Sequence, residues 1–521
     1  MERAVLDIRS PAGRAARPRR TATRPLLLVA EAAVLGALLV LAVLARRPHY
    51  LLTRSFWLDE GWVADSVRAP LGQLKLLTSS TPIGWTLLLR LVPPLGGPER
   101  YRLLPLAFGV AAVPPAWLLA RRLGRFGPVR ALLAALTAAL APAALARHDL
   151  KQYSAEAFVA VGVLALVAWV EAGWSRRRLA LLALLGAAAI LLANIAPFVV
   201  VGGLVALALA AALRRRWRQA AEAGVALLGV AAVHLLVYRT VAAAGDNPPM
   251  RRWWTVFYLP LHAGFGQAAR FAGHHAAVML ASVGFGPWPL ALALVLLGAW
   301  SLARAGRWAA ALLLPLLALE LLAAGAAQRY PFLEARTSLF LAVLLAVYAA
   351  LGLGELAAVL LARGWTAPLA PAVTIAVVAL LLVPAGARAA RTPMPDADVR
   401  EQIAVVRTGW HLGDAVVVAP SATFPFAYYW PDQPSFVPTR VGTAVNFMVA
   451  YPGHPELVMV DRAAELAAGM AAAHAAGRRI WVILALGSPG SARAFAAEAA
   501  RYGRVTHPRP RSGPLLVEPA R

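Results

Sequence analysis

Long apolar runs, each near the length of a helix that crosses a lipid bilayer, recur along the first three quarters of the chain. A transmembrane helix needs about 20 predominantly apolar residues. The runs are continuous and do not alternate with polar residues, so they favour helices over the strands of a β-barrel. The pattern predicts an α-helical polytopic membrane protein with about eleven transmembrane helices, at 26–45, 101–120, 129–147, 154–173, 179–196, 197–213, 220–241, 288–304, 308–327, 337–357 and 367–386.

A shorter apolar run at 82–96 differs from the others. It begins at Thr81-Pro82 and is interrupted by Arg90 and by Pro93-Pro94. We expect a juxtamembrane helix in the first external loop, which lies at the membrane interface or re-enters the bilayer without crossing it.

The arginines provide a check on this topology. With the N-terminus in the cytoplasm and 82–96 not spanning, every short loop assigned to the cytoplasmic side is basic, as the positive-inside rule requires. If 82–96 crossed the membrane, the same loops would face outward. The basic loops are 121–130, 174–179, 214–219, 303–307 and 361–366.

The last quarter of the chain has a different pattern, in which short apolar strands alternate with helical stretches. It predicts a small C-terminal α/β domain on the extracytoplasmic side. The chain is thus expected to comprise a basic cytoplasmic tail (1–25), a transmembrane domain (26–386) and this α/β domain (387–521). The predicted strands and helices lie at 415–418, 457–460, 462–476, 480–486, 489–502 and 515–517.

Composition supports a membrane location and excludes several site types. The chain has 521 residues, of which 60% are hydrophobic and 15% charged, whereas soluble domains average about 25% charged residues. The net charge of +26 follows from the arginine-rich loops and does not indicate nucleic-acid binding. Because there is no cysteine, disulfides, iron–sulfur clusters and thiolate zinc sites are excluded.

An acidic pair, Asp59 and Glu60, lies in the segment SFWLDEG just after the first predicted span. The simpler interpretation is a solvated start of a loop, with Trp57 anchored at the interface. The functional interpretation is an acidic centre at the membrane surface. One carboxylate would accept a proton from an attacking hydroxyl, and its neighbour would orient the acceptor or hold a divalent metal.

Two further charged clusters are expected on the same side of the membrane. Mixed charges there suit a phosphate leaving group with an acid nearby, and an arginine at a helix start favours phosphate. The alternative is that these are ordinary polar loops whose arginines extend to the interface. The clusters are RHDLKQYSAE at 147–156, with Asp149, Lys151, Tyr153 and Glu156, and QRYPFLEARTS at 328–338, with Tyr330 and Arg336.

Five segments together resemble the GT-C type of membrane glycosyltransferase, in the branch of the protein O-mannosyltransferases and the lipid A aminoarabinose transferases. Their order and their common predicted side of the membrane strengthen the resemblance, which covers roughly 26–350. The segments are WLDEG, TPIGWTLLLRL, LGGPERYRLLPLAFGV, DLKQYSAE and YPFLEARTSLFL.

The resemblance implies transfer of a hexosyl or pentosyl group from a polyprenyl-phosphate donor to a lipid or glycan acceptor at the outer face of the membrane. It implies that Asp59 is the base or a metal-linked acid and that Glu60 helps to orient the acceptor. Asp149 would be a further acid, or with Asp59 a ligand of Mg or Mn if such an ion takes part. Lys151 and Arg336 would neutralise the donor phosphate, with Tyr153, Glu156 and Tyr330 as further substrate-binding residues.

The chain departs from the family pattern in two respects. It has Thr81-Pro82 where Pro-Pro is usual, and it lacks the large external domains of the protein O-mannosyltransferases, which argues against a protein acceptor. Two other classes stay open at this point. A secondary transporter would place ionisable residues near mid-membrane, where Glu320 is the exception among the spans. A non-catalytic lipid-binding protein would share the fold without the chemistry.

Overall fold

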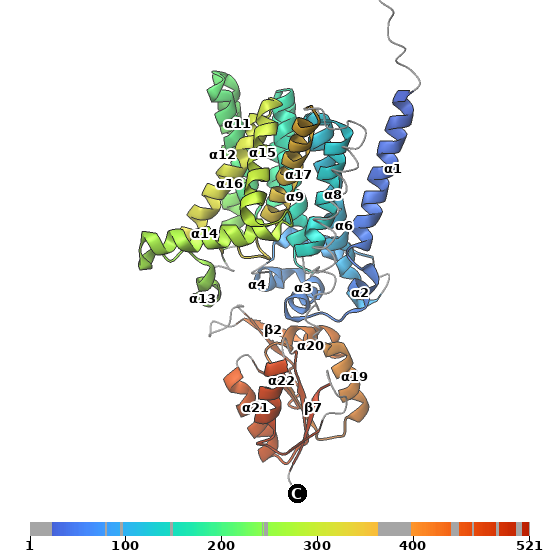
Figure 1. The fold of residues 1–521 in the computed structure, drawn as a ribbon. Helices are drawn as coiled ribbons and strands as arrows, with labels where there is room; N and C mark the ends of the chain where they lie inside the picture. Colours follow the sequence, from blue (N-terminus) through green and yellow to red (C-terminus); the bar gives the residue numbers. More distant parts are fainter. Residues whose placement is uncertain are drawn as a thin grey trace, which may run out of the picture.

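The computed structural model places a bundle of long helices above a small α/β region, with short helices between the two (Figure 1). The α/β part, residues 398–519, is called the C-terminal α/β region below. The structure describes residues 23–78, 81–93, 97–124, 126–145, 150–241, 243, 248–362, 398–438, 447–460, 463–485, 489–506 and 513–519.

The bundle is built around two almost wholly apolar helices, α9 and α17. Helix α17 approaches α15 so closely that a Cβ on Gly298 would overlap the carbonyl oxygen of Tyr348, and one on Gly352 would overlap that of Leu294. Small residues permit such close packing between helices in a membrane. The long helices are α1 (Thr23–Leu44), α8 (Pro128–Leu145), α9 (Tyr153–Ala172), α10 (Arg176–Ile190), α11 (Ala196–Leu213), α12 (Trp217–Thr240), α15 (Trp288–Arg304), α16 (Trp308–Ala326) and α17 (Leu339–Ala362), with α6 (Leu103–Ala111) and α7 (Val113–Leu118) forming one further passage.

Six described helical stretches are long and apolar enough to cross a membrane, and the chain is a multi-pass membrane protein. They are Pro98–Leu123, Tyr153–Ala172, Ala196–Leu213, Trp217–Thr240, Trp308–Ala326 and Leu339–Val359, and shorter apolar helices occupy Leu28–Leu44, Pro128–Leu140 and Trp288–Arg304. The predicted span at 179–196 corresponds to the 15-residue helix α10. The predicted span at 367–386 lies outside the described residues, so the count of eleven stays a prediction.

The run at 82–96 forms only an eight-residue helix, α5 (Ile83–Arg90). At 1.5 Å per residue it is about 12 Å long, far short of the roughly 30 Å hydrocarbon layer. This length agrees with the prediction that the segment does not cross the membrane. Helix α14 (Phe265–Ser282) runs across the bundle at the end nearer the C-terminal α/β region (Figure 1).

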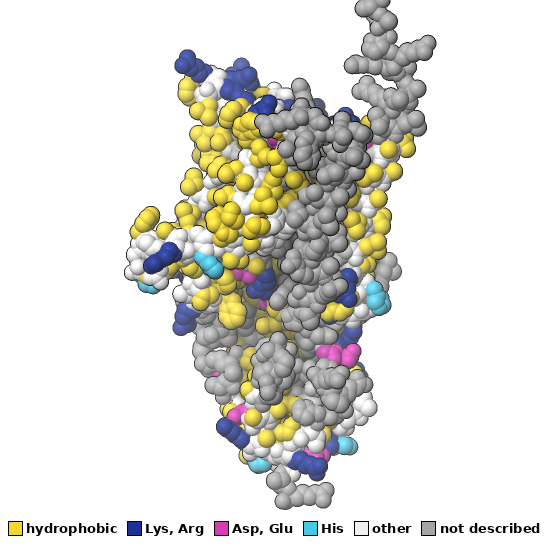
Figure 2. Space-filling view, viewed as in Figure 1, with side chains coloured by type: hydrophobic (Ala, Val, Ile, Leu, Met, Phe, Trp, Pro, Cys, Tyr) yellow, Lys and Arg dark blue, Asp and Glu magenta, His cyan; other side chains and the backbone are white. Residues whose placement is uncertain are grey.

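The flank of the bundle is apolar, and one of its ends is basic. Figure 2 shows hydrophobic side chains along the flank and Lys and Arg side chains at the end farther from the C-terminal α/β region. The turn between α11 and α12 lies at this end and exposes Arg214, Arg215, Arg216 and Arg218. The two ends of the bundle therefore differ in charge, as a membrane protein with a fixed orientation requires.

Three short helices fill the space between the bundle and the C-terminal α/β region: α2 (Pro48–Thr53), α3 (Leu58–Arg68) and α4 (Leu74–Leu77) (Figure 1). Helix α3 packs directly on α20 (Thr423–Tyr429) of that region. A Cβ on Gly61 would overlap the backbone of Pro425, and Trp62 stacks on Phe424 with ring centroids 5.7 Å apart. These contacts fix helix α3, which carries Asp59 and Glu60, against the C-terminal α/β region.

The C-terminal α/β region contains a five-stranded sheet in the order β4-β1-β5-β7-β6. Strand β1 pairs in parallel with β4 and β5, whereas β7 pairs antiparallel with β5 and β6. This confirms the predicted α/β character, whereas the hairpin β2–β3, strand β6 and helices α19 and α20 were not predicted. The elements are α19 (Val399–Gly409), β1 (Ala415–Val418), β2 (Ser435–Pro438), β3 (Phe447–Ala450), β4 (Leu457–Met459), α21 (Ala463–Ala475), β5 (Ile480–Ile483), α22 (Pro489–Ala499), β6 (Arg504–Thr506) and β7 (Leu515–Glu518).

Candidate functional site

Asp59 forms the centre of a charged site at the end of the bundle that faces the C-terminal α/β region. Its Oδ2 lies 3.3 Å from Nζ of Lys151 and 3.2 Å from a guanidinium nitrogen of Arg336. Lys151 lies just before α9 and Arg336 just before α17, so three segments far apart in the sequence converge on one carboxylate. Lys151 and Arg336 are called the cation pair below.

Aromatic side chains and a helix-start turn hold the cation pair in place. Nζ of Lys151 lies 5.4 Å from the ring centroid of Trp62, and the guanidinium of Arg336 lies 5.8 Å from that of Trp57. Both distances suit a cation–π contact. Glu334 accepts hydrogen bonds from the backbone N–H groups of Arg336 (3.1 Å) and of Thr337 (2.8 Å), which shapes the turn that leads into α17.

The carboxylate of Asp59 keeps one oxygen available. Both ion pairs reach Oδ2, and within the described part of the chain Oδ1 makes no hydrogen bond or ion pair. The side chain is 17% exposed, so a reactant can approach it. Asp59 also lies in the first turn of α3, where the aligned N–H groups favour a negative charge.

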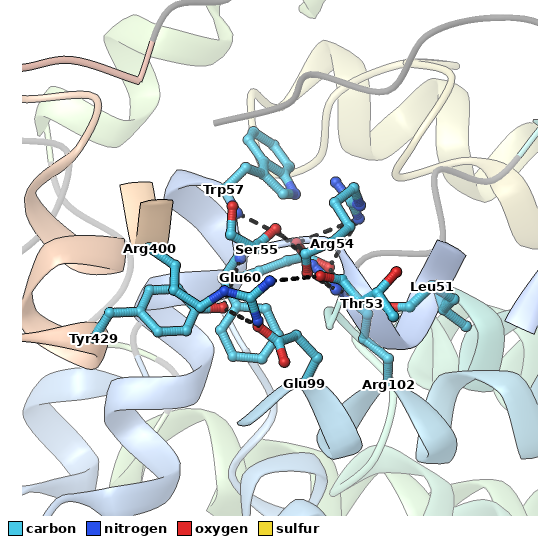
Figure 3. A network of polar contacts seen from close by, with 11 residues as sticks. Leu51, Thr53, Arg54, Ser55, Trp57, Glu60, Glu99, Arg102, Arg400 and Tyr429 are labelled. Atoms are coloured by element: carbon cyan, nitrogen blue, oxygen red, sulfur yellow. Dashed lines mark hydrogen bonds and ion pairs between the residues drawn. The ribbon is translucent and has the colours of Figure 1, made fainter. Parts of the chain in front are cut away.

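Glu60 is fully buried and belongs to a separate polar network (Figure 3). Its Oε1 and Oε2 lie 2.7 and 2.5 Å from the Nε and Nη2 of Arg102, and Arg54 lies 3.4 Å away. Arg102 also donates to three backbone carbonyls of α2 and of the loop that follows it, those of Leu51, Arg54 and Ser55. The two acids of the pair therefore have different surroundings, one partly open and one enclosed.

A neighbouring network ties the same loop to the C-terminal α/β region (Figure 3). Glu99 Oε1 accepts hydrogen bonds from Arg400 (2.5 Å) and from the hydroxyl of Tyr429 (2.8 Å). Arg400 also donates to the carbonyl of Thr53, and the backbone N–H of Phe56 donates to the Tyr429 hydroxyl. The loop that leads to Asp59 is thereby held by Arg102 and by the C-terminal α/β region.

Tyr153, Glu156 and Tyr330 form a second group of buried or largely buried side chains. Glu156 accepts hydrogen bonds from the side chain of Gln152 (3.2 Å) and the backbone N–H of Asn194 (3.1 Å). The Tyr330 hydroxyl donates to the carbonyl of Thr337 at 2.7 Å. Burial, and then the neighbouring Glu156 and Tyr153, raise the pKa of the Tyr330 hydroxyl well above its ordinary value.

The structure thus brings Asp59, Lys151 and Arg336 together and places Glu60 in a separate network. Asp149 lies outside the described residues, and its place in the site stays a prediction. The sequence analysis did not find Arg102, Trp62 or Glu334. Of these, Arg102 and Glu334 had a visible signal, because they lie within the segments LGGPERYRLLPLAFGV and YPFLEARTSLFL.

The predicted divalent-metal site at Asp59 and Asp149 stays a prediction, because Asp149 lies outside the described residues. No group of three His, Asp or Glu side chains suited to a metal ion occurs among the parts of the chain that the structure describes. Asp59 is already neutralised by the cation pair, which competes with a metal ion for the same oxygen. We therefore derive no step through a metal.

Comparison with known proteins identifies the fold class. No protein-family model and no curated protein sequence matches the chain. Among solved structures, the match extends over nearly the whole length of a membrane glycosyltransferase of the GT-C type, and the chain has the GT-C fold.

That structure is ArnT from Cupriavidus metallidurans in the apo state, with a TM-score of 0.52, 16% identity, and coverage of 95% of this chain and 98% of that one. The same protein bound to undecaprenyl phosphate matches with a TM-score of 0.50 and 15% identity over the same shares. The archaeal oligosaccharyltransferase AglB from Archaeoglobus fulgidus, in complex with an inhibitory peptide and a dolichol-phosphate, matches with a TM-score of 0.47 and 14% identity. The chain covers 63% of the length of AglB.

Proposed function

We propose that this protein is a membrane glycosyltransferase that moves a hexosyl or pentosyl group from a polyprenyl-phosphate donor to an acceptor of the cell envelope. The observation that carries the proposal is the Asp59 carboxylate held between Lys151 and Arg336 at one end of an apolar bundle. A GT-C fold supports it, as does the binding of undecaprenyl phosphate by the structurally similar ArnT.

The proposed reaction needs an acid–base group beside a phosphate-binding pair. The acceptor hydroxyl oxygen attacks the anomeric carbon of the donor and forms the new glycosidic bond. The bond from that carbon to the phosphate oxygen breaks, and polyprenyl phosphate leaves with the electron pair. Asp59 takes the proton of the acceptor hydroxyl, and the cation pair stabilises the charge that develops on the phosphate.

The other residues of the site have supporting roles in this proposal. Glu60 has both oxygens engaged with Arg102, so we assign it the positioning of α3 and not contact with the substrate. Tyr153, Glu156 and Tyr330 would contact the sugar or its phosphate, and Asp149 would supply a further acid.

We further propose that the end of the bundle with Asp59 and the C-terminal α/β region face the outside of the cytoplasmic membrane. The opposite end exposes the arginines of the α11–α12 turn, which suits the cytoplasmic side. A lipid-linked donor would then react at the outer face.

The experiment is a transfer assay with the full chain in proteoliposomes and a panel of labelled polyprenyl-phosphate sugars. Arg336→Ala is expected to raise the KM for the donor by about 10- to 100-fold, because a charge-assisted contact to phosphate contributes about 1.5–3 kcal/mol. Arg329→Ala is the matched control, since it removes an exposed arginine of the same loop and should leave the donor KM unchanged.

Two outcomes would contradict the proposal. Solute flux across the vesicles with no sugar transfer by the wild type would favour a transporter. Donor binding without turnover would favour a non-catalytic lipid-binding protein.

A further inference from the structure

A cavity of about 270 Å³ lies between the C-terminal half of α3 and the C-terminal α/β region. Asp65, Arg68 and Gln73 line it from the membrane side, and Trp430 and Gln433 from the opposite side. It is distinct from the Asp59 site. Asp65 follows Asp59 by six residues on α3, which places it about 9 Å further along the helix and about 120° around it.

Asp65 is the unexplained group in this cavity. Its side chain belongs to a residue only 3% exposed, and its buried Oδ2 has no hydrogen-bond partner among the described residues. The buried hydroxyl of nearby Tyr451 also has none in the same part of the chain. Buried polar groups are normally paired, and leaving one unpaired costs about 1–3 kcal/mol.

The protonation state of Asp65 suits a hydrogen-bonding ligand. Burial raises the pKa of its carboxyl well above the ordinary value, an effect that Arg68 only partly opposes. The raised pKa favours the protonated carboxyl of Asp65, which can both donate and accept hydrogen bonds, as the hydroxyl groups of a sugar do.

The remaining walls combine fixed polar groups with an aromatic face. The guanidinium of Arg68 lies 3.5 Å from the ring centroid of Tyr428 and donates to its carbonyl at 2.7 Å. The indole of Trp430 stacks on Phe426 at 4.7 Å and donates to Asp432 at 3.0 Å. A half-buried indole beside amide and carboxyl groups is an arrangement that orients a polar ring by stacking and hydrogen bonding.

Other ligand classes fit less well. The cavity is lined by the carboxyl of Asp432 and by Arg68, whose guanidinium is already engaged with Tyr428, which disfavours a phosphate or another anion. A metal ion lacks a set of three ligands within the described residues. A purely apolar ligand would leave the buried carboxyl of Asp65 without a partner.

We propose that this cavity is a subsite for a neutral saccharide unit of the acceptor, remote from the hydroxyl that reacts at Asp59. The inference rests on the proposed transferase function and makes the acceptor a glycan of more than one sugar. The lipid-phosphate donor would occupy the cation pair, and the remote saccharide unit of the acceptor would occupy the cavity beside the C-terminal half of α3.

The test measures binding of neutral hexose and pentose oligosaccharides to the full chain in detergent, by calorimetry and saturation-transfer NMR, without donor. At least one oligosaccharide should bind, and Asp65→Leu and Trp430→Ala should each weaken its binding by about tenfold or more. Asp65→Asn, which keeps hydrogen-bonding capacity, should retain most of the affinity. Trp253→Ala removes an exposed tryptophan elsewhere and is the matched control.

Thermal unfolding of each variant shows whether it is folded, and Trp430→Ala tests the subsite even if Asp65→Leu fails to fold. Absence of binding by the wild type to every oligosaccharide, or equal affinity in wild type and Trp430→Ala, would overturn the subsite. The binding assay omits the donor, so it does not depend on the reaction at Asp59. The saccharide result is therefore separate from the transfer assay, whose failure would overturn the proposed function instead.

Discussion

Replacement of Asp59 by Asn is expected to lower kcat for sugar transfer by about 10²- to 10⁴-fold, the usual contribution of a positioned general base. Asparagine has nearly the same shape but cannot take the proton of the acceptor hydroxyl. It also releases Lys151 and Arg336 from their ion pairs with Oδ2, so binding of the donor phosphate should be retained or strengthened. The expected signature is a loss in kcat with no rise in the donor KM.

The matched control is Glu498→Gln, which neutralises a surface acid paired with Arg501 in the C-terminal α/β region. It should transfer sugar at the wild-type rate. Full activity of Asp59→Asn would remove Asp59 from the reaction, and an equal loss in both variants would indicate a non-specific effect of charge.

Replacement of Arg102 by Ala is expected to destabilise the fold by up to about 3–5 kcal/mol, because it removes the closest partner of the buried Glu60 carboxylate and leaves only the longer contacts with Arg54 and the backbone N–H of Trp57. Arg102 and Glu60 are both fully buried, and the loss also frees the carbonyls of Leu51, Arg54 and Ser55. Thermal or denaturant unfolding in detergent measures the effect. Transfer should fall in parallel, since this loop leads to Asp59.

Arg501→Ala is the control for this variant, because its ion pair with Glu498 is exposed and should contribute less than about 1 kcal/mol. A double variant, Glu60→Gln with Arg102→Met, should recover part of the lost stability by removing both charges. If Arg102→Ala were as stable as the wild type, the network in Figure 3 would not hold the loop.

The helices of the membrane bundle were predictable because each depends on its own run of apolar residues. About 20 apolar residues in succession need a bilayer or a protein core whatever lies elsewhere in the chain. The same holds for the strands Ala415–Val418 and Ile480–Ile483, whose uniformly apolar residues are typical of buried parallel strands. The weak cases were β6 and the hairpin β2–β3, whose residues are partly exposed and not uniformly buried.

The candidate site was predictable only in part because its contacts join distant segments. Asp59 and Arg336 are 277 positions apart, and no sequence pattern specifies that they meet. Their common predicted side of the membrane placed them in one region, and the resemblance to GT-C transferases implied a role for each in the same reaction.

The contacts of the acidic pair could not be predicted from the neighbouring residues in the sequence. Asp59 and Glu60 are adjacent in sequence, yet one residue of helix turns their side chains about 100° apart. Asp59 therefore meets the cation pair, while Glu60 meets Arg102, 42 positions away. The cavity at Asp65 was likewise not predictable, since more than half of its lining residues come from the C-terminal α/β region.

The most direct test of the central claim is a structure of the Asp59→Asn variant with bound undecaprenyl phosphate. The account predicts that the phosphate lies within hydrogen-bonding distance of Nζ of Lys151 and of the Arg336 guanidinium, beside residue 59. A phosphate bound elsewhere, with neither Lys151 nor Arg336 in contact with it, would contradict the account.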